Sequence, residues 1–238
     1  MRKTFSAILL DIEGTTTPIA FVHDVLFPYA RAHLREYLGD IPDPHAVALL
    51  KQEWPRDAAA TPKLPRPDES MESLAKYVEW LMDRDRKSPG LKALQGLVWQ
   101  RGYRTGALTG VVFPDVPRAL QRWRKDGIKT AIYSSGSVLA QRLLFSTTAF
   151  GDLTPLLTDF FDTSAGGKTF EDSYRGIAAA LGCAPPQMLF VSDVGGEIDA
   201  ARRAGCQVVL CVRPGNAPQQ VSEDQRFVHS FDDIEMDS

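Results

Sequence analysis

Two acidic side chains follow a short apolar segment near the start of the chain, because residues 5–10 lead directly into Asp11, Ile12 and Glu13. The apolar segment has the length of a buried strand, and residues two apart in an extended chain point to the same side. We therefore expect Asp11 and Glu13 to project together from the carboxyl end of a strand, where open α/β sheets place their chemistry.

Two neighbouring carboxylates repel each other unless a cation or a proton separates them. The pair therefore predicts either a divalent metal site or a division of roles between a nucleophile and an acid. The alternative is an acidic, solvated turn, since Glu-Gly sequences after strands are common in turns. The rest of the chain must distinguish these interpretations.

Size and composition limit the class of protein. A chain of 238 residues forms one large domain or one domain with an insertion. Its net charge is −3, from 27 basic and 30 acidic residues without a basic block, so no nucleic-acid surface is expected. The three cysteines, Cys183, Cys206 and Cys211, lack paired CxxC spacing and are expected to be buried core thiols rather than disulfides or zinc ligands.

The chain also shows no targeting or membrane signal. No segment approaches the roughly 18 apolar residues that span a membrane. The apolar run before Asp11 is only six residues long, which is shorter than the core of a signal peptide. We therefore expect a soluble, cytoplasmic protein with no membrane partner.

Strand and helix patterns alternate after about residue 112. Asp115 is the expected N-cap of a helix that ends before Gly127. Strands are expected at 128–133, 188–192 and 207–212, with helices at 137–146, 169–181 and 197–204 and a short apolar segment at 160–161. This alternation predicts βαβ crossovers and a parallel sheet.

Residues 19 to about 110 break the alternation. Helical apolar spacing occurs around 25–34, 74–82 and 91–98, and six prolines between residues 42 and 67 predict a long loop between the first helices. The expected fold is α/β, a Rossmann-like parallel sheet with helices on both faces and an inserted α-helical cap. Residues 1–18 and 111–238 would form the α/β core, and residues 19–110 the cap after the first strand.

Polar residues follow two later strands in the order that a phosphate site would need. Ser134 and Ser135 come directly after the 128–133 strand, where hydroxyl and N–H groups can hold a phosphate oxygen. The alternative is helix capping, which Gly136 and Ser137 also fit. Asp193 ends the 188–192 strand and could ligate a hard cation jointly with Asp11, the alternative being an N-cap.

Lys168 lies in a Gly-Gly-Lys-Thr sequence ahead of a helix. Its cation could neutralise both a phosphate and the Asp11 carboxylate. A P-loop is excluded, because Asp162 occupies the place of that motif's first glycine. The alternative is a solvated loop lysine.

The order of these features resembles the haloacid dehalogenase superfamily, whose members are mostly phosphatases. The features are Asp-x-Glu-Gly-Thr after the first strand, a cap, a serine after a strand, a lysine in a loop and an aspartate after a further strand. Within that superfamily the chain is similar to the methionine-salvage enolase-phosphatase family, also called acireductone synthase. The resemblance spans about residues 8–216. The segments that carry it are 11–22, 26–29, 85–87, 91–96, Trp99, 133–137 and 212–216.

The resemblance implies roles for the candidate residues. Asp11 would attack phosphorus and form an aspartyl-phosphate, and Ser134, Ser135 and Lys168 would bind the phosphate. One Mg²⁺ per subunit would be held by Asp11, Asp193 and Glu13, the last through its backbone carbonyl. Glu13 would protonate the leaving oxygen and later activate water, although most phosphatases of the superfamily carry Asp at that position.

The substrate that the resemblance implies is 2,3-diketo-5-methylthiopentyl-1-phosphate, which is first enolised and then dephosphorylated. The residue that acts as the base in enolisation is not identified, and Glu13 is the first candidate. The cap is expected to supply an apolar wall for the methylthio group. The alternatives are a Mg²⁺-dependent phosphatase for another small phosphate ester and a non-catalytic binding domain. A monomer is expected.

Overall fold

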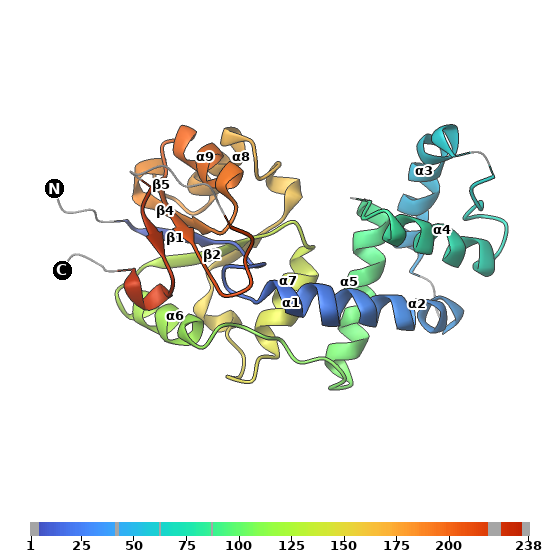
Figure 1. Ribbon diagram of the computed structural model, residues 1–238, viewed down its shortest axis with the longest axis horizontal. Coiled ribbons are helices and arrows are strands. Elements are labelled where there is room, and N and C mark those ends of the chain that lie inside the picture. Colours follow the sequence, from blue (N-terminus) through green and yellow to red (C-terminus); the bar gives the residue numbers. More distant parts are fainter. Residues whose placement is uncertain (1–4, 41–42, 62, 87, 219–224, 235–238) are drawn as a thin grey trace. The chain divides into compact units, whose positions relative to one another are not determined.

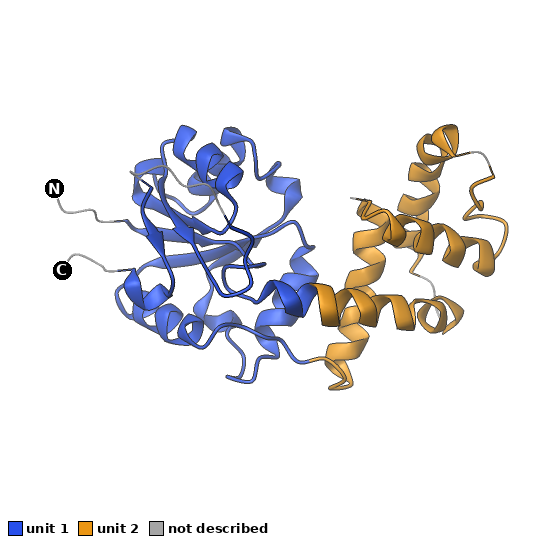
Figure 2. Cartoon of the chain, in the orientation of Figure 1, with its two compact units in different colours: residues 1–22, 109–238 blue, residues 23–108 orange. Residues whose placement is uncertain are grey.

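The computed structural model describes residues 5–40, 43–61, 63–86, 88–218 and 225–234 (Figure 1). The chain divides into two compact units, one formed by residues 1–22 and 109–238 and the other by residues 23–108 (Figure 2). The sequence-based boundaries, after residues 18 and 110, lie a few residues from these divisions. The helical unit is thus an insertion between the first strand and the rest of the sheet.

Six strands of the first unit form one parallel sheet in the order β3-β2-β1-β4-β5-β6. β1 lies inside the sheet because all four of its residues are apolar and buried, as both faces of a central parallel strand require. The predicted parallel α/β sheet is confirmed. The strands are β1 (Ala7–Leu10), β2 (Lys129–Tyr133), β3 (Asp159–Phe161), β4 (Met188–Ser192), β5 (Gln207–Cys211) and β6 (Phe227–Val228).

Helices cover both faces of this sheet. α8 (Glu171–Ala180) and α9 (Gly195–Arg203) pack Tyr174, Ile177 and Ile198 into one apolar cluster with Ala7 and Leu9 of β1. Figure 1 shows α6 (Asp115–Lys125) on the other side of the sheet. The remaining helices of this unit are α1 (Ile19–Phe21) and α7 (Val138–Ser146).

Asp115 is not the N-cap that its sequence position suggests. Pro114 is the N-cap of α6, and Asp115 is the first residue inside the helix. Its carboxylate instead accepts a hydrogen bond from the N–H of Phe231 at 2.6 Å and pairs with Arg213 at 2.8 Å. These partners are about a hundred residues away in sequence, so local capping signals could not identify them.

In its described residues, the second unit contains four α-helices: α2 (Phe27–Asp40), α3 (Pro44–Ala60), α4 (Met71–Asp83) and α5 (Pro89–Arg104), with a π-helical turn at Val22–Leu26 before α2. The prediction of a long proline-rich loop between the first helices is wrong over residues 44–60. Pro44 occupies the first turn of α3, where a missing N–H costs nothing, and the Asp43 side chain caps this end at 2.8 Å.

Pro55 lies inside α3. It removes a helical hydrogen bond, a loss that the helix tolerates because Ala46, Leu50 and Asp57 bury its inner face. Three residues named in the sequence analysis lie outside the described residues. They are Pro42 and Pro62 of the proline series and Lys87 of the family-like segment 85–87.

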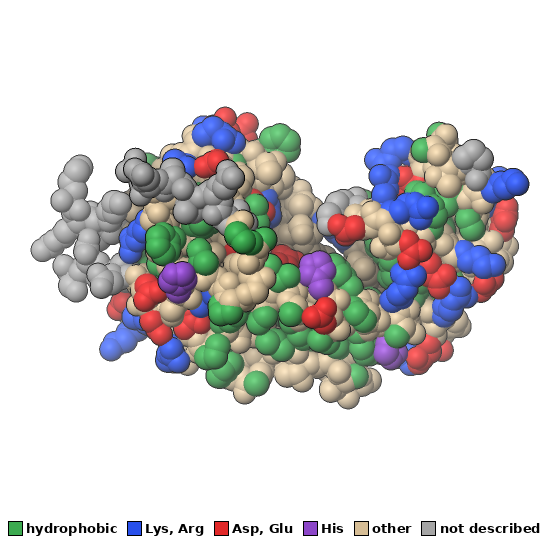
Figure 3. Space-filling view, viewed as in Figure 1, with side chains coloured by type: hydrophobic (Ala, Val, Ile, Leu, Met, Phe, Trp, Pro, Cys, Tyr) green, Lys and Arg blue, Asp and Glu red, His purple; other side chains and the backbone are tan. Residues whose placement is uncertain are grey.

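Arginines on the surface of the second unit are paired with acids. Arg35 contacts Glu72 at 2.6 Å and Glu79 at 2.8 Å, and Arg101 contacts Asp40 at 2.7 Å. On the face drawn in Figure 3, basic and acidic side chains are accordingly intermixed in this unit. Among the described helices, none has the length and apolar character needed to cross a membrane.

Cys206 and Cys211 are buried, as predicted for core thiols, whereas Cys183 is only partly buried. All three are free cysteines. Cys183 differs from the prediction because it follows the end of α8 and packs against the edge of the apolar core, whereas Cys206 belongs to that core.

Candidate active site

Asp11 comes directly after β1 and is 2% exposed. Its main-chain N–H donates to the Val191 carbonyl at 3.0 Å, which continues the ladder between β1 and β4. Carboxylate oxygen Oδ1 lies 2.7 Å from the N–H of Ile12 and 2.6 Å from Nζ of Lys168, and Oδ2 accepts from the Ser192 hydroxyl at 2.9 Å. Both oxygens are therefore fixed in place by the protein itself.

A tight loop follows Asp11. The N–H groups of residues 15–17 all point to the Ile12 carbonyl, at 2.9 to 3.2 Å. Gly14 has a φ of +69°, a left-handed conformation that glycine adopts without steric cost. The loop therefore has a defined path, set by its own hydrogen bonds.

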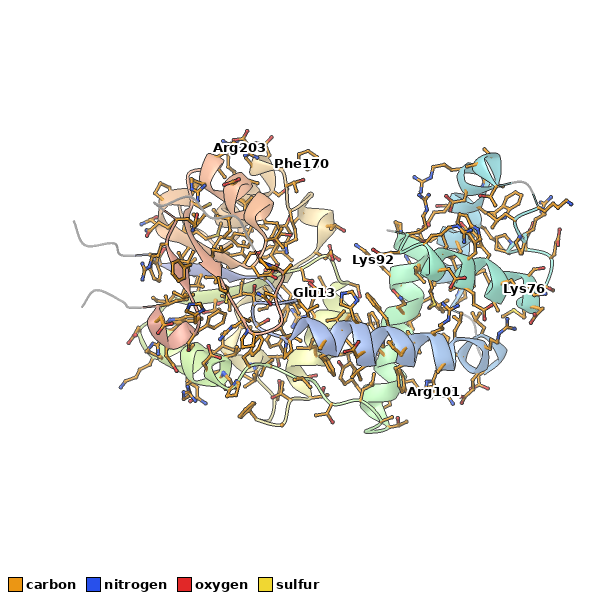
Figure 4. The ribbon with its side chains drawn as sticks, in the orientation of Figure 1. Glu13, Lys76, Lys92, Arg101, Phe170 and Arg203 are labelled. Atoms are coloured by element: carbon orange, nitrogen blue, oxygen red, sulfur yellow. The ribbon has the colours of Figure 1, made fainter. Side chains whose placement is uncertain are left out.

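Glu13 lies in this loop and is partly buried (labelled in Figure 4). β1 ends at Leu10, and the chain turns after Asp11, so Asp11 and Glu13 are not alternate residues of one extended strand as the sequence reasoning assumed. The charge of Glu13 nevertheless acts on Asp193, where it is one of the smaller causes of a raised pKa, after burial and the Asp11 charge. The loop thus brings Glu13 to the same group of carboxylates by a different geometry.

Lys168 closes a ring of polar contacts with Asp11. Its Nζ lies 2.7 Å from Oε2 of Glu197, and the Ser192 hydroxyl lies 2.9 Å from both Asp11 Oδ2 and Glu197 Oε2. The side chain of Lys168 is only 10% exposed, so it is not a solvated loop lysine. Burial acts to lower the pKa of Lys168, but the charges of Asp11 and Glu197 outweigh it and raise that pKa above its usual value.

Asp193 directly follows β4 and is buried, while Val194 is the N-cap of α9, so the alternative role of Asp193 as an N-cap is wrong. Burial, and after it the negative charge of Asp11, raises the pKa of Asp193 to about 7. The same two causes raise the pKa of Glu197 to about 8. The site therefore holds more negative charge than the single Lys168 ammonium can neutralise.

This excess charge suits a hard divalent cation. Asp11 and Asp193 supply carboxylate oxygens, and Mg²⁺ typically binds one or two carboxylates together with waters and substrate phosphate. A Cβ on Gly14 would come within 2.3 Å of Oδ2 of Asp193, so the main chain of the loop approaches this carboxylate closely. Among the described residues, no three or more His, Cys, Asp or Glu side chains gather as a metal-ligand group. A cation bound by Asp11 and Asp193 would thus take its other ligands from main-chain oxygen or water.

Ser134 and Ser135 follow β2, the neighbour of β1 in the sheet. The Ser134 hydroxyl is buried and accepts from the N–H of Gly136 at 3.2 Å. Helix α7 is capped by Ser137, so neither predicted serine serves as the cap. Within the described ranges the Ser135 hydroxyl makes no hydrogen bond, which leaves it able to contact a ligand.

Four further residues belong to this region and were given no role from the sequence. Ser192 and Glu197 complete the ring around Asp11 and Lys168. The position of Glu197, four residues after Asp193, was the sequence feature that could have identified it as a site residue. Asn216 donates to the Gly14 carbonyl at 2.9 Å, and Arg213 donates to the Thr15 carbonyl at 3.1 Å. The family-like segment 212–216 pointed to these two residues without showing what they contact.

Comparison with known proteins identifies the family to which this arrangement belongs. A sequence model of the haloacid dehalogenase-like hydrolases matches residues 5–205. The chain is 48% identical over 236 residues to enolase-phosphatase E1 of Synechococcus elongatus, covering 97% of this chain and 98% of that protein. It is 42% identical over 230 residues to enolase-phosphatase E1 of Drosophila melanogaster, with 94% and 89% of the two chains covered.

Solved structures agree with this assignment. The crystal structure of the UTR4 protein of Saccharomyces cerevisiae is similar with a TM-score of 0.80 and 33% identity, over 97% of this chain and 100% of that one. CbbY from Rhodobacter sphaeroides shares the fold with a TM-score of 0.62 at 17% identity, over 97% and 96% of the chains. The chain belongs to the enolase-phosphatase E1 family within the haloacid dehalogenase-like hydrolases.

Proposed function

We propose that the chain is an enolase-phosphatase of methionine salvage. It would enolise 2,3-diketo-5-methylthiopentyl-1-phosphate and then hydrolyse the phosphate ester to give the acireductone 1,2-dihydroxy-3-keto-5-methylthiopentene. Family membership supports this reaction. The observation that carries it is the Asp11 carboxylate, which Lys168 and Ser192 hold at the carboxyl edge of the sheet at 2.6 and 2.9 Å.

Asp11 acts as the nucleophile in the phosphatase step. One of its oxygens attacks phosphorus, and the bond from phosphorus to the substrate oxygen breaks as Glu13 gives that oxygen a proton. Water then attacks phosphorus in the aspartyl-phosphate, and Glu13 takes the proton from that water. Inorganic phosphate leaves, and the Asp11 carboxylate is restored.

Lys168, Ser134 and Ser135 bind the phosphate in this proposal. The raised pKa of Lys168 keeps its ammonium charged, so it serves as a fixed cation rather than as a base. Phosphoryl transfer depends mainly on positioning and on neutralising charge, which are the two contributions that a buried ammonium makes. The hydroxyl and main-chain N–H of Ser135 can donate to the remaining phosphate oxygens.

We assign one Mg²⁺ to Asp11, Asp193 and the main-chain carbonyl of Glu13. When bound, this cation would neutralise the charge of the transferring phosphoryl group and of the carboxylates around it. The raised pKa of Asp193 supports the assignment, because burial and the Asp11 charge destabilise its ionised form by more than the Lys168 charge stabilises it.

Enolisation needs a base beside the carbonyl carbon that loses its proton. Glu13 is our candidate for this base, because Asp11 is held by Lys168 and Ser192 for its later attack on phosphorus, and Glu197 is hydrogen-bonded to the same two residues. A proton taken by Glu13 in enolisation would then be available for the leaving oxygen. The proposal also includes a monomeric, cytoplasmic enzyme, which light scattering and cell fractionation would test.

The test uses the purified protein, Mg²⁺ and the diketone phosphate, with ultraviolet absorbance to follow the enol and a separate assay for phosphate. The wild-type protein should form the absorbing intermediate and release phosphate. Asp11→Asn should abolish phosphate release without unfolding the protein. Phosphate release from other esters with an inert diketone would instead indicate a different phosphatase, and inactivity toward both would indicate a binding domain.

A further inference from the structure

The segment that carries Lys168 is held by an unusual set of hydrogen bonds. Residues 166–168 lie between a 3₁₀ turn, Thr163–Ala165, and helix α8, and they belong to no helix or strand. Each of their three consecutive main-chain carbonyls accepts from a different side-chain hydroxyl. The Tyr133 hydroxyl donates to Gly166 at 2.8 Å, that of Ser173 to Gly167 at 2.9 Å, and that of Tyr174 to Lys168 at 2.6 Å.

The three donors are themselves rigidly placed. Tyr133 and Tyr174 are 0% exposed and Ser173 is 3% exposed. Tyr133 ends β2, whereas Ser173 and Tyr174 lie in the first turn of α8. The Tyr133 and Tyr174 rings pack edge to face with centroids 5.7 Å apart, and Tyr174 packs in the same way on Phe190 at 4.9 Å.

The glycines explain why the loop depends on these hydroxyls. Gly166 has a φ of +118°, and a Cβ there would come within 2.1 Å of the Ser173 hydroxyl oxygen. Gly166 and Gly167 therefore let the main chain approach the donors, but they contribute no side chains that could anchor the loop by packing. Phe170, the N-cap residue of α8, is 67% exposed, although its ring lies against Gly167 (Figure 4). The three hydroxyl hydrogen bonds therefore act together with two main-chain ones, from the N–H of Gly166 to Thr163 at 3.2 Å and from the N–H of Phe170 to Gly167 at 3.0 Å, to hold the loop.

The position of the loop determines the position of the Lys168 ammonium. Nζ must lie within hydrogen-bond distance of Asp11 and Glu197 at once, and it does so at 2.6 and 2.7 Å. A flexible four-carbon side chain on a mobile loop would not keep both contacts, because it could choose other rotamers at each loop position. A fixed main chain removes this freedom.

We propose that Tyr133, Ser173 and Tyr174 are positioning residues, which set the Lys168 ammonium for phosphoryl transfer by fixing the three carbonyls of its loop. Their hydroxyls donate to the main chain and not to the substrate. The inference rests on the proposed phosphatase function. It extends that function to residues on β2 and α8 that lie behind the reacting groups.

Tyr174→Phe is the cleanest test, because it keeps the packed ring and removes only the hydroxyl that binds Lys168. We expect kcat for phosphate release to fall by about tenfold and KM to rise several-fold, because the ammonium both binds the phosphate and acts in its transfer, and misplacing a catalytic group by ~1 Å can cost about 10²-fold. Tyr77→Phe is the matched control. It removes another buried tyrosine hydroxyl, which donates to Asp57 in the helical unit at 2.9 Å, and it should leave kcat unchanged.

A double-mutant cycle separates positioning from general stability. In a Lys168→Met protein, adding Tyr174→Phe should change kcat by less than about twofold, because the group to be positioned is already absent. A full tenfold loss in that background would overturn the inference, as would a single variant with the wild-type kcat. Denaturant unfolding of each variant verifies that the measured proteins are folded.

Binding of inorganic phosphate in the presence of Mg²⁺, measured by calorimetry, tests the same inference without turnover. Tyr174→Phe should weaken phosphate binding several-fold, and Tyr77→Phe should not. Equal affinities of wild type and Tyr174→Phe would overturn the positioning role even in a protein that proved inactive on every ester. Absence of wild-type turnover would overturn the proposed function by itself.

Discussion

Replacing Lys168 with Met removes the buried ammonium that contacts Asp11 and keeps most of the side-chain length. In the wild-type protein this ammonium contacts Asp11 at 2.6 Å and Glu197 at 2.7 Å, and the lysine side chain is 10% exposed. Both carboxylates are also nearly inaccessible to water, with side chains 3% and 13% exposed. The substitution therefore leaves two buried carboxyl groups without their cation.

The size of the effect follows from this burial. Removing one partner from a buried ion pair costs about 3–5 kcal/mol of folding stability, because the remaining charge stays desolvated. Part of that cost is relieved when Glu197, whose pKa is already raised to about 8 by burial and then by the Asp11 charge, takes up a proton. Loss of a preorganised charge that stabilises the transition state costs about 2–4 kcal/mol, or about 30- to 1,000-fold in kcat/KM.

Two measurements check these values: steady-state phosphate release from the diketone phosphate and urea unfolding of the same preparations. Arg175→Met is the matched control. It also removes a cation, but one whose pairs with Glu171 and Asp172 are exposed, so its effect on stability should be below about 1 kcal/mol and kcat should not change. A Lys168→Met protein whose kcat/KM stays within about threefold of wild type would refute the reasoning, since that corresponds to well under 1 kcal/mol.

Three further predictions concern the loop after Asp11 and its supports. Gly14→Ala places a Cβ 2.3 Å from Oδ2 of Asp193 at a φ of +69°, so kcat should fall by about tenfold or more, and a wild-type kcat would show that this close approach is not needed. Asn216→Ala removes the hydrogen bond to the Gly14 carbonyl and should lower unfolding free energy by about 1 kcal/mol in urea titrations, against which an unchanged midpoint would argue. Asp115→Asn tests the pair with Arg213: burial alone would raise the pKa of Asp115, but the hydrogen bonds from Arg213 and the Phe231 N–H hold it below its usual value. The ionised Asp115 stabilises the fold at pH 7, and this contribution is lost as the carboxyl becomes protonated at low pH. The variant should therefore be less stable than wild type by about 3 kcal/mol at pH 7, and this deficit should shrink as the pH falls below about 4. A deficit that is constant with pH would contradict the ion pair.

Local sequence patterns were sufficient for the elements that position the site. The apolar run before Asp11 and the strand at 188–192 could be recognised because a buried parallel strand must be apolar on both faces. Asp193 could be proposed as a site residue because it follows such a strand, and Lys168 because it lies in a loop ahead of a helix. The structure adds that Lys168 contacts Asp11 directly, which the order of residues along the chain could only suggest.

Other features depend on partners far apart in sequence. Ser192 reads as the last residue of an apolar strand, and only the pairing of β1 with β4 brings its hydroxyl to Asp11. Asp115 is a residue type that is common at N-caps, yet its carboxylate binds Arg213 and the N–H of Phe231 instead. Helix α3 was missed because proline counts ignore position, and a proline in the first turn does not break a helix.

The most direct test of the account is to identify the residue that carries the phosphoryl group during turnover. Acyl-phosphates are reduced by borohydride to the alcohol, so quenching the wild-type enzyme with borohydride during hydrolysis, followed by peptide mass spectrometry, marks the aspartate that attacked phosphorus. We predict conversion of Asp11 to homoserine in the presence of substrate and no conversion in its absence. Turnover with an unmodified Asp11, or with the modification on another carboxylate, would contradict the central claim.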